Sequence, residues 1–320
     1  KLSYPLMLLA LLSIFEDWSW VYNGYDPVNS ESRITPLLNI NFLTSLLIIS
    51  AFGFMYWIDL KQRDSNTIQS RNSYLKLISK SIPVILMLII YFAFRIEITT
   101  YWNQLYLDSA LFISPEGQEF PNYLWNYDIK KLSHIWTINY TLLFVSVLSL
   151  ITIKKIKNRQ LGVINIVLNC LVIAFFLFVG LYELSELRES YLARNSSEYY
   201  QIGPWNIIMR YISYIFVGFA LLATYNYSKQ DFLKLRFSIG FDLLLNISIL
   251  WISSSELINW MDLLEFSQSY KLGLSILWGL YALLLIILGI WKNKKHLRIM
   301  GFALFGITLV KLFLYDISHL

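Results

Sequence analysis

The chain has 320 residues, of which 57 % are hydrophobic and 15 % are charged, and its formal net charge is +5. Soluble domains average about 25 % charged and about 45–50 % apolar residues, so this composition excludes an ordinary soluble protein. The positive charge lies in short loops between apolar stretches, which is a topology signal and argues against a nucleic-acid partner. Cys170 is the single cysteine, and no Cys/His spacing typical of a metal site occurs. We therefore expect no metal and no other cofactor.

Apolar stretches recur along the whole chain, and a membrane span needs about 20 such residues. In chain order, the candidate spans cover residues 3–21, 37–58, 77–100, 133–153, 161–184, 204–226, 237–258, 272–291 and 299–317. Short loops connect most of them. The sequence therefore predicts an all-α polytopic bundle of about nine transmembrane helices, arranged as consecutive helical hairpins, with membrane lipid as the surrounding partner.

The basic residues predict the orientation of the spans. Sixteen Lys and Arg residues fall in the alternate loops around 61–80, 154–159, 229–236 and 292–298, whereas six fall in the loops between them. Because short cytoplasmic loops are enriched in Lys and Arg, residue 1 is predicted to be cytoplasmic and residue 320 to lie on the outer side of the cytoplasmic membrane.

We expect residues 1–320 to form one transmembrane domain. Residues 101–131 make up the largest outer loop, which is predicted to lie along the interface or to tuck back between helices. Residues 185–203 form a second outer loop that begins with charged, helix-forming residues and can extend the fifth span. The chain begins with Lys1 and enters an apolar run almost at once, so we expect it to be a piece of a longer multi-span chain.

A carboxylate recurs near the outer end of each outgoing span. These residues are Glu16, Glu97, Glu183, Glu256 and Asp316. The last three follow the basic residues Arg159, Arg236 and Arg298 by 24, 20 and 18 residues, which is about one membrane thickness at about 1.5 Å per residue. Two interpretations stay open. The carboxylates simply occupy wet helix ends, or they line a common outward-facing polar groove.

Four further embedded charges need partners. Arg95 and Glu97 are two residues apart, so they point to different faces of a helix. Arg210 lies inside the sixth span and is predicted either to pair with Glu97 or Glu183 or to extend its charge to the surface. Lys311 either extends outward or pairs with a neighbouring carboxylate, and Asp242 is predicted to pair with a basic loop. We assign Arg95, Arg210 and Lys311 to the candidate outer polar groove.

The last fifty residues carry a family resemblance. They contain a W-x-x-Y-A-L-L-L-x-x-L-G helix with Trp278, Tyr281, Ala282 and Gly289, a basic turn with Leu297 and Arg298, and a K-x-F-L-x-D-[IL]-S ending with Lys311, Phe313, Leu314, Asp316 and Ser318. Over residues 273–320 the chain resembles the bacterial polytopic membrane proteins catalogued as domain of unknown function 2339. The resemblance implies a long chain of many spans, with further residues before residue 1 and after residue 320, and no established activity.

Two functions are compatible with these observations. The first is a non-enzymatic scaffold or partner-binding component whose aromatic and acidic outer loops contact an envelope protein. The second is an enzyme or transporter that handles an envelope glycan or lipid-linked intermediate at the outer face, with candidate carboxylates Glu16, Asp17, Asp26 and Glu31 and with Arg210 for a phosphate. Ion-coupled transport ranks lower, because it requires charges nearer the midplane. No catalytic residue is assigned.

Overall fold

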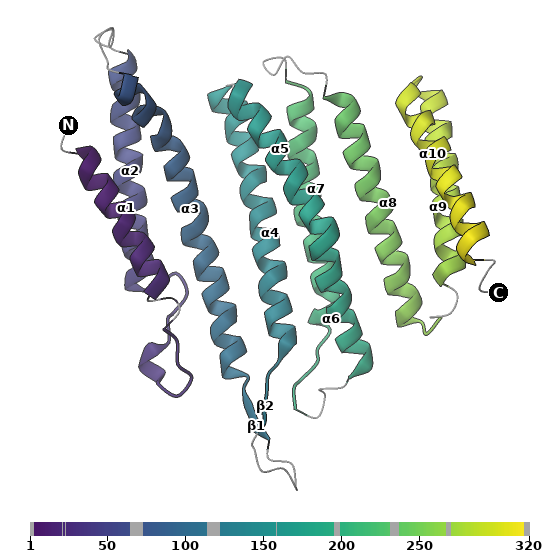
Figure 1. The fold of residues 1–320 in the computed structure, drawn as a ribbon, viewed down its shortest axis with the longest axis horizontal. Coiled ribbons are helices and arrows are strands. Elements are labelled where there is room, and N and C mark those ends of the chain that lie inside the picture. Colours follow the sequence, from purple (N-terminus) through teal and green to yellow (C-terminus); the bar gives the residue numbers. More distant parts are fainter. Residues whose placement is uncertain are drawn as a thin grey trace. The chain divides into compact units, whose positions relative to one another are not determined.

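The computed structural model describes residues 3–20, 22, 24–64, 73–113, 122–157, 159–194, 199–230, 237–266 and 270–316. Long helices make up nearly all of this part of the chain (Figure 1). The helices are α1 (Ser3–Trp20), α2 (Ile40–Asp64), α3 (Ser73–Asp108), α4 (Tyr127–Ile151), α5 (Arg159–Phe175), α6 (Leu181–Ala193), α7 (Trp205–Ser228), α8 (Ser238–Leu263), α9 (Tyr270–Trp291) and α10 (Lys295–Lys311). The predicted all-α class is confirmed.

In the part of the chain that the structure describes, three π-helical turns interrupt or extend the α-helices. One at Phe176–Gly180 joins α5 and α6 into a continuous helix, and the others follow α4 (Thr152–Ile156) and α10 (Leu312–Asp316). Within the described residues, eight helices are long and apolar enough to cross a membrane. They correspond to the second to ninth predicted spans. The first predicted span forms α1, which is not among the eight; its last turns carry the two carboxylates Glu16 and Asp17.

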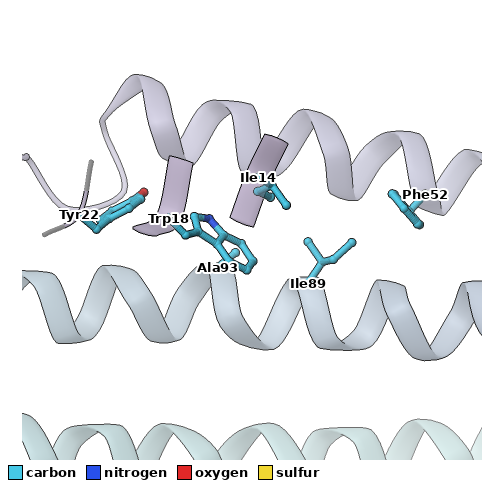
Figure 2. Packing of buried hydrophobic residues seen from close by; sticks show 6 residues of the cluster. All are labelled: Ile14, Trp18, Tyr22, Phe52, Ile89 and Ala93. Carbon is cyan, nitrogen blue, oxygen red and sulfur yellow. The ribbon is translucent and has the colours of Figure 1, made fainter. Parts of the chain in front are cut away.

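The chain divides into two compact units, Lys1–Thr137 and Ile138–Leu320, which are described separately below. In unit 1, α1, α2 and α3 share a small apolar core. Ile14 and Trp18 on α1 and Ile89 and Ala93 on α3 are spaced four residues apart, so each pair occupies one helix face. Figure 2 shows these side chains gathered between the facing ribbons, together with Phe52 of α2. The predicted single domain over residues 1–320 stays a prediction.

The predicted outer loop after residue 100 differs from expectation at its start. Helix α3 continues to Asp108, and a two-stranded antiparallel hairpin follows, with β1 (Leu111–Ile113) paired to β2 (Asn122–Leu124). Phe112 lies opposite Tyr123 in this register. The residues between the two strands lie outside the described part of the chain. Residues that had been interpreted as an interfacial segment therefore extend a span and begin a hairpin.

Unit 2 is held together by polar contacts within its apolar helices. The Asn139 side-chain amide donates a hydrogen bond to Ser213 Oγ (3.0 Å), which joins α4 to α7. The Asn165 amide on α5 donates to Tyr227 Oη on α7 (2.9 Å), and the Asn169 amide donates to Ser149 Oγ on α4 (2.7 Å). Such contacts hold membrane helices together, because lipid offers an unpaired polar group no alternative partner.

Candidate functional site

The residues of the predicted outer polar groove are divided between the two units. Unit 1 contains Glu16, Arg95 and Glu97 together with the alternative carboxylates Asp17, Asp26 and Glu31. Unit 2 contains Glu183, Arg210, Glu256, Lys311 and Asp316. A groove common to both sets stays a prediction. The contacts within each unit are described in turn.

Glu97 is the most enclosed carboxylate of unit 1, with 4 % of its surface exposed. Tyr22 Oη donates a hydrogen bond to Oε1 (2.5 Å), the Leu37 backbone N–H donates to Oε2 (2.8 Å), and the Asn39 amide donates to both oxygens (3.0 and 3.2 Å). All of these donors come from the segment between α1 and α2. A buried carboxylate is stable when donors surround it in this way.

Two of these donors are placed by the start of α2. Asn39 immediately precedes the helix, and its Oδ1 accepts a hydrogen bond from the Phe42 backbone N–H (2.7 Å), as a capping residue does. Leu37 has φ 61°, a left-handed conformation that costs an L-residue roughly 1–2 kcal/mol. The bond from Leu37 to Glu97 offsets this strain. Glu97 therefore fixes the backbone entry into α2.

The face of α3 that carries Glu97 also holds the rest of the segment between α1 and α2. Gln104 and Asp108 follow Glu97 by seven and eleven residues, close to two and three helical turns. The buried Gln104 amide exchanges two hydrogen bonds with the Ile34 backbone, both of 3.2 Å. Asp108 accepts a hydrogen bond from Tyr25 and pairs with Arg33 at 3.6 Å. Glu97, Gln104 and Asp108 form what we call the loop clamp.

The hydrogen bond from Tyr22 to Glu97 of the loop clamp should make the free energy of unfolding fall at alkaline pH. Burial, first, and then the neighbouring Glu97 carboxylate raise the pKa of the Tyr22 phenol above its ordinary value of about 10. The unfolded chain loses this proton from about pH 10 upward while the folded chain keeps it, so the stabilisation is complete below that pH and declines above it. Thermal unfolding in detergent should show wild type losing up to about 1.4 kcal/mol per pH unit relative to Tyr22→Phe. Equal slopes for the two proteins would contradict the role of Tyr22.

The other charged candidates of unit 1 are less enclosed. Glu16 is exposed and Asp17 half-buried on α1, while Asp26 and Glu31 are exposed in the loop. Asp26 Oδ1 accepts a hydrogen bond from the Val28 backbone N–H (3.0 Å), which is a turn contact. This contact gives the Asp26 carboxylate a part in shaping the loop.

Arg95 lies away from the donors that enclose Glu97. Its guanidinium carbon is 5.9 Å from the centroid of the Phe92 ring, which is within the range of a cation–π contact. Its Nε is buried and has no hydrogen-bond partner within the described part of the chain. The two-residue separation from Glu97 explains why the two charges, although adjacent in sequence, have different surroundings.

Arg210 is the largest fully buried side chain of the described chain, with 1 % of its surface exposed. Its Nη1 donates to Ser255 Oγ (2.9 Å) and Tyr214 Oη (3.2 Å), and it lies 3.8 Å from Glu256 Oε2. Glu256 also accepts hydrogen bonds from the hydroxyls of Tyr211 (2.8 Å) and Tyr214 (3.0 Å). A neutral hydroxyl shell and one carboxylate thus hold this arginine between α7 and α8.

These contacts correct two predictions for Arg210. Its carboxylate partner within unit 2 is Glu256 rather than Glu183, and its guanidinium does not extend to the surface. Pairing with Glu97 of unit 1 stays a prediction. The depth of each residue along its helix can be counted from the sequence, but the rotation of α7 against α8 cannot. That rotation decides which carboxylate faces Arg210.

A second buried arginine was missed by the sequence reasoning, which counted Arg188 among the charges of an outer loop. Arg188 lies on α6 and its side chain is 5 % exposed. Its Nη2 pairs with Asp262 of α8 at 2.9 Å. Ser255, Asn259 and Asp262 are spaced by four and three residues, so they share one face of α8. That spacing was the available signal, because it continues one polar helix face from Ser255 past residue 258, where the span was predicted to end.

The remaining unit 2 candidates make local contacts or lie partly outside the description. Glu183 is half-buried on α6. Lys311 donates hydrogen bonds to Ser275 Oγ (2.7 Å) and to the Lys271 backbone carbonyl (2.9 Å), which ties α10 to α9. The backbone of Asp316 belongs to the turn after α10, but its side chain lies outside the described residues.

The predicted pairing of Asp242 with a basic loop is confirmed. Asp242 Oδ2 lies 2.5 Å from Lys294 Nζ and 2.7 Å from His296 Nε2. Lys294 lies between α9 and α10, and His296 lies in the first turn of α10. These contacts fix the N-terminal end of α8 to the α9–α10 hairpin. Among the residues that the structure describes, no three His, Cys, Asp or Glu side chains group together as metal ligands would.

Comparison with known proteins identifies the family. The family described as "Predicted membrane protein (DUF2339)" matches residues 139–320, more than half of the chain. The chain belongs to this family. No curated protein and no solved structure matches it. The resemblance predicted over residues 273–320 is thus confirmed, and the DUF2339 match extends upstream through every helix of unit 2.

The residues that carried the DUF2339 resemblance pack helices together. Trp278 Nε1 donates to Ser254 Oγ (2.9 Å) and Tyr281 Oη to Asn246 Oδ1 (2.9 Å), so both aromatic side chains join α9 to α8. A β-carbon at Gly289 would lie 2.8 Å from the Arg298 backbone nitrogen, closer than real contacts allow. These positions therefore serve close helix packing.

Proposed function

We propose that this DUF2339 chain is a non-enzymatic scaffold or partner-binding component of the bacterial inner membrane, with residue 1 in the cytoplasm. One observation carries the proposal: the embedded charges and the family-resembling residues contact neighbouring helices or the chain's own loop. Glu97 is occupied by loop donors, Lys311 by α9, and Trp278 and Tyr281 by α8. Charges used in this way stabilise a rigid framework, which is what a scaffold requires.

The surface that fits a protein partner best is the hairpin between α3 and α4. Phe112 and Tyr123 are 61 % and 62 % exposed, and their ring centroids lie 5.7 Å apart. Contacts continue from Tyr123 to Trp125 and from Trp125 to Tyr106, with centroid separations of 6.4 and 5.4 Å. Exposed aromatic side chains are typical of the centres of protein interfaces. A two-stranded hairpin is at best marginally stable in water, so a partner that covers it would also stabilise it.

Site-specific photocrosslinking in native membranes tests this proposal. A benzoylphenylalanine replacing Phe112 or Tyr123 should give a discrete adduct with one envelope protein, identified by mass spectrometry. The matched control replaces Leu283, a 54 % exposed residue of α9, which should react with lipid only. If both hairpin positions, like Leu283, give adducts with lipid only, the hairpin is not a protein-binding surface. That outcome would contradict the proposed partner-binding role.

The alternative function, an enzyme or transporter for a lipid-linked or glycan intermediate, is favoured by a different observation. Several buried donors of Arg188 and Arg210 lack hydrogen-bond partners among the described residues. Such donors suit a phosphate group. This feature does not depend on the scaffold proposal.

A further inference from the structure

The helix ends that meet around Arg188 and Arg210 contain an unusual concentration of buried donors. Arg188 lies in the last two turns of α6, Arg210 is the sixth residue of α7, and Asn259 lies in the last turns of α8. The side chains of Arg188 and Arg210 are 5 % and 1 % exposed, and Asn259 is fully buried. At about 1.5 Å per residue, Arg210 lies about 8 Å from the start of its helix, near the level at which a span leaves the hydrocarbon.

Polar atoms from these three side chains have no hydrogen-bond partner in the described part of the chain. They are Arg188 Nε and Nη1, Arg210 Nη2, and Asn259 Nδ2 and Oδ1. Leaving a buried polar group unpaired costs about 1–3 kcal/mol, and more when the group is charged. Most buried polar atoms in native proteins have a partner, so a cluster of exceptions calls for an explanation. Elsewhere in the described chain Arg95, Asn139 and Asn169 leave one such atom each, whereas these three side chains leave five. Four of the five atoms are donors, so the matching partner is rich in acceptor oxygens.

The charges around the two guanidinium groups indicate which class of ligand can bind them. One edge of each guanidinium already faces a carboxylate, because Arg188 pairs with Asp262 at 2.9 Å and Arg210 lies 3.8 Å from Glu256. Arg188 also lies 3.7 Å from the exposed carboxylate of Glu189. Two guanidinium groups thus face three carboxylates, so the remaining edges offer hydrogen-bond donors without excess positive charge. This arrangement favours a monoanion over a dianion.

We propose that the ends of α6, α7 and α8 bind a phosphate group through Arg188, Arg210 and Asn259. Arginine forks match phosphate oxygens with two parallel hydrogen bonds, and a phosphate diester carries a single negative charge. A phospholipid headgroup carries such a diester. Free inorganic phosphate offers the same chemistry, so the test has separate arms for the two sources.

The test uses the whole chain purified in a maltoside detergent, which contains no phosphate. Binding is followed by native mass spectrometry and by the thermal shift on adding phosphatidylglycerol or inorganic phosphate. Asn259→Leu removes the unpaired amide but leaves both ion pairs intact. Its matched control is Asn169→Leu, because Asn169 is also fully buried and its Oδ1 also lacks a partner among the described residues, but its amide nitrogen bonds to Ser149 and it is not part of the proposed site. Arg188→Lys keeps the charge and removes the fork, and it serves as the second variant if Asn259→Leu does not fold.

We expect phosphatidylglycerol to bind wild type and Asn169→Leu alike, and about tenfold more weakly to Asn259→Leu and Arg188→Lys, as the loss of one charge-assisted hydrogen bond predicts. The same pattern with inorganic phosphate alone would assign the site to the free ion. The proposal is overturned if neither probe binds, or if Asn259→Leu and Arg188→Lys bind as wild type does. The scaffold proposal is judged separately by protein adducts at Phe112 and Tyr123.

Discussion

Glu97→Ala is expected to lower the free energy of unfolding by about 3–5 kcal/mol, because several donors lose their shared acceptor and each unpaired buried donor costs about 1–3 kcal/mol. The substitution leaves the Tyr22 hydroxyl, the Leu37 N–H and the Asn39 amide without their shared acceptor. It also removes the bond that holds Leu37 in its left-handed conformation. Glu97→Gln keeps the shape and one acceptor oxygen, so its cost should be about 1–3 kcal/mol.

Thermal unfolding and trypsin digestion in detergent check this prediction. Release of the loop should expose the Arg33 peptide bond, so Glu97→Ala should be cleaved there faster than wild type under native conditions. Glu16→Gln is the control, since Glu16 is exposed on α1 and its loss should change stability by less than about 0.5 kcal/mol. Unchanged cleavage at Arg33 together with unchanged thermal stability in Glu97→Ala would exclude the loop clamp as a fastening device.

The second large effect is an asymmetry between the two partners of the buried pair in unit 2. Glu256→Ala leaves the Arg210 charge, 1 % exposed, with only neutral partners, and should cost about 3–5 kcal/mol. Arg210→Met leaves a carboxylate that is 22 % exposed and still accepts hydrogen bonds from Tyr211 and Tyr214, so it should cost less than half as much. The double variant should recover most of the loss, because it buries no unpaired charge.

A double-mutant cycle, measured by thermal unfolding in one detergent, tests whether Arg210 and Glu256 are energetically coupled. The coupling energy should favour the pair by about 1–3 kcal/mol, as for residues in direct contact. The control cycle pairs Arg210→Met with Asp242→Asn, because Asp242 contacts Lys294 at the other end of α8 and its effect should simply add. Additive effects of Arg210→Met and Glu256→Ala would show that the two side chains do not interact.

The apolar spans and the loop charges could be read from the sequence because they follow from length and hydropathy, which act locally. The eight described helices that are long and apolar enough to cross a membrane, and the DUF2339 family, are examples. Asp242 was also placed correctly, since a carboxylate near a basic loop has partners close at hand whichever way its helix turns. The start of α8 and the loop before α10 lie at the same end of their spans.

The partners of Glu97 and Arg210 could not be predicted from the sequence. Hydropathy requires that such charges find partners, but helix rotation and loop conformation choose them. The donors to Glu97 come from a loop 58–75 residues away, positioned by the cap of α2. Arg210 pairs with Glu256 because the two face each other across α7 and α8. The sequence by itself determined the membrane class, the spans and the need to pair each buried charge, whereas the tertiary structure alone decided the pairs, because packing between helices sets which faces meet.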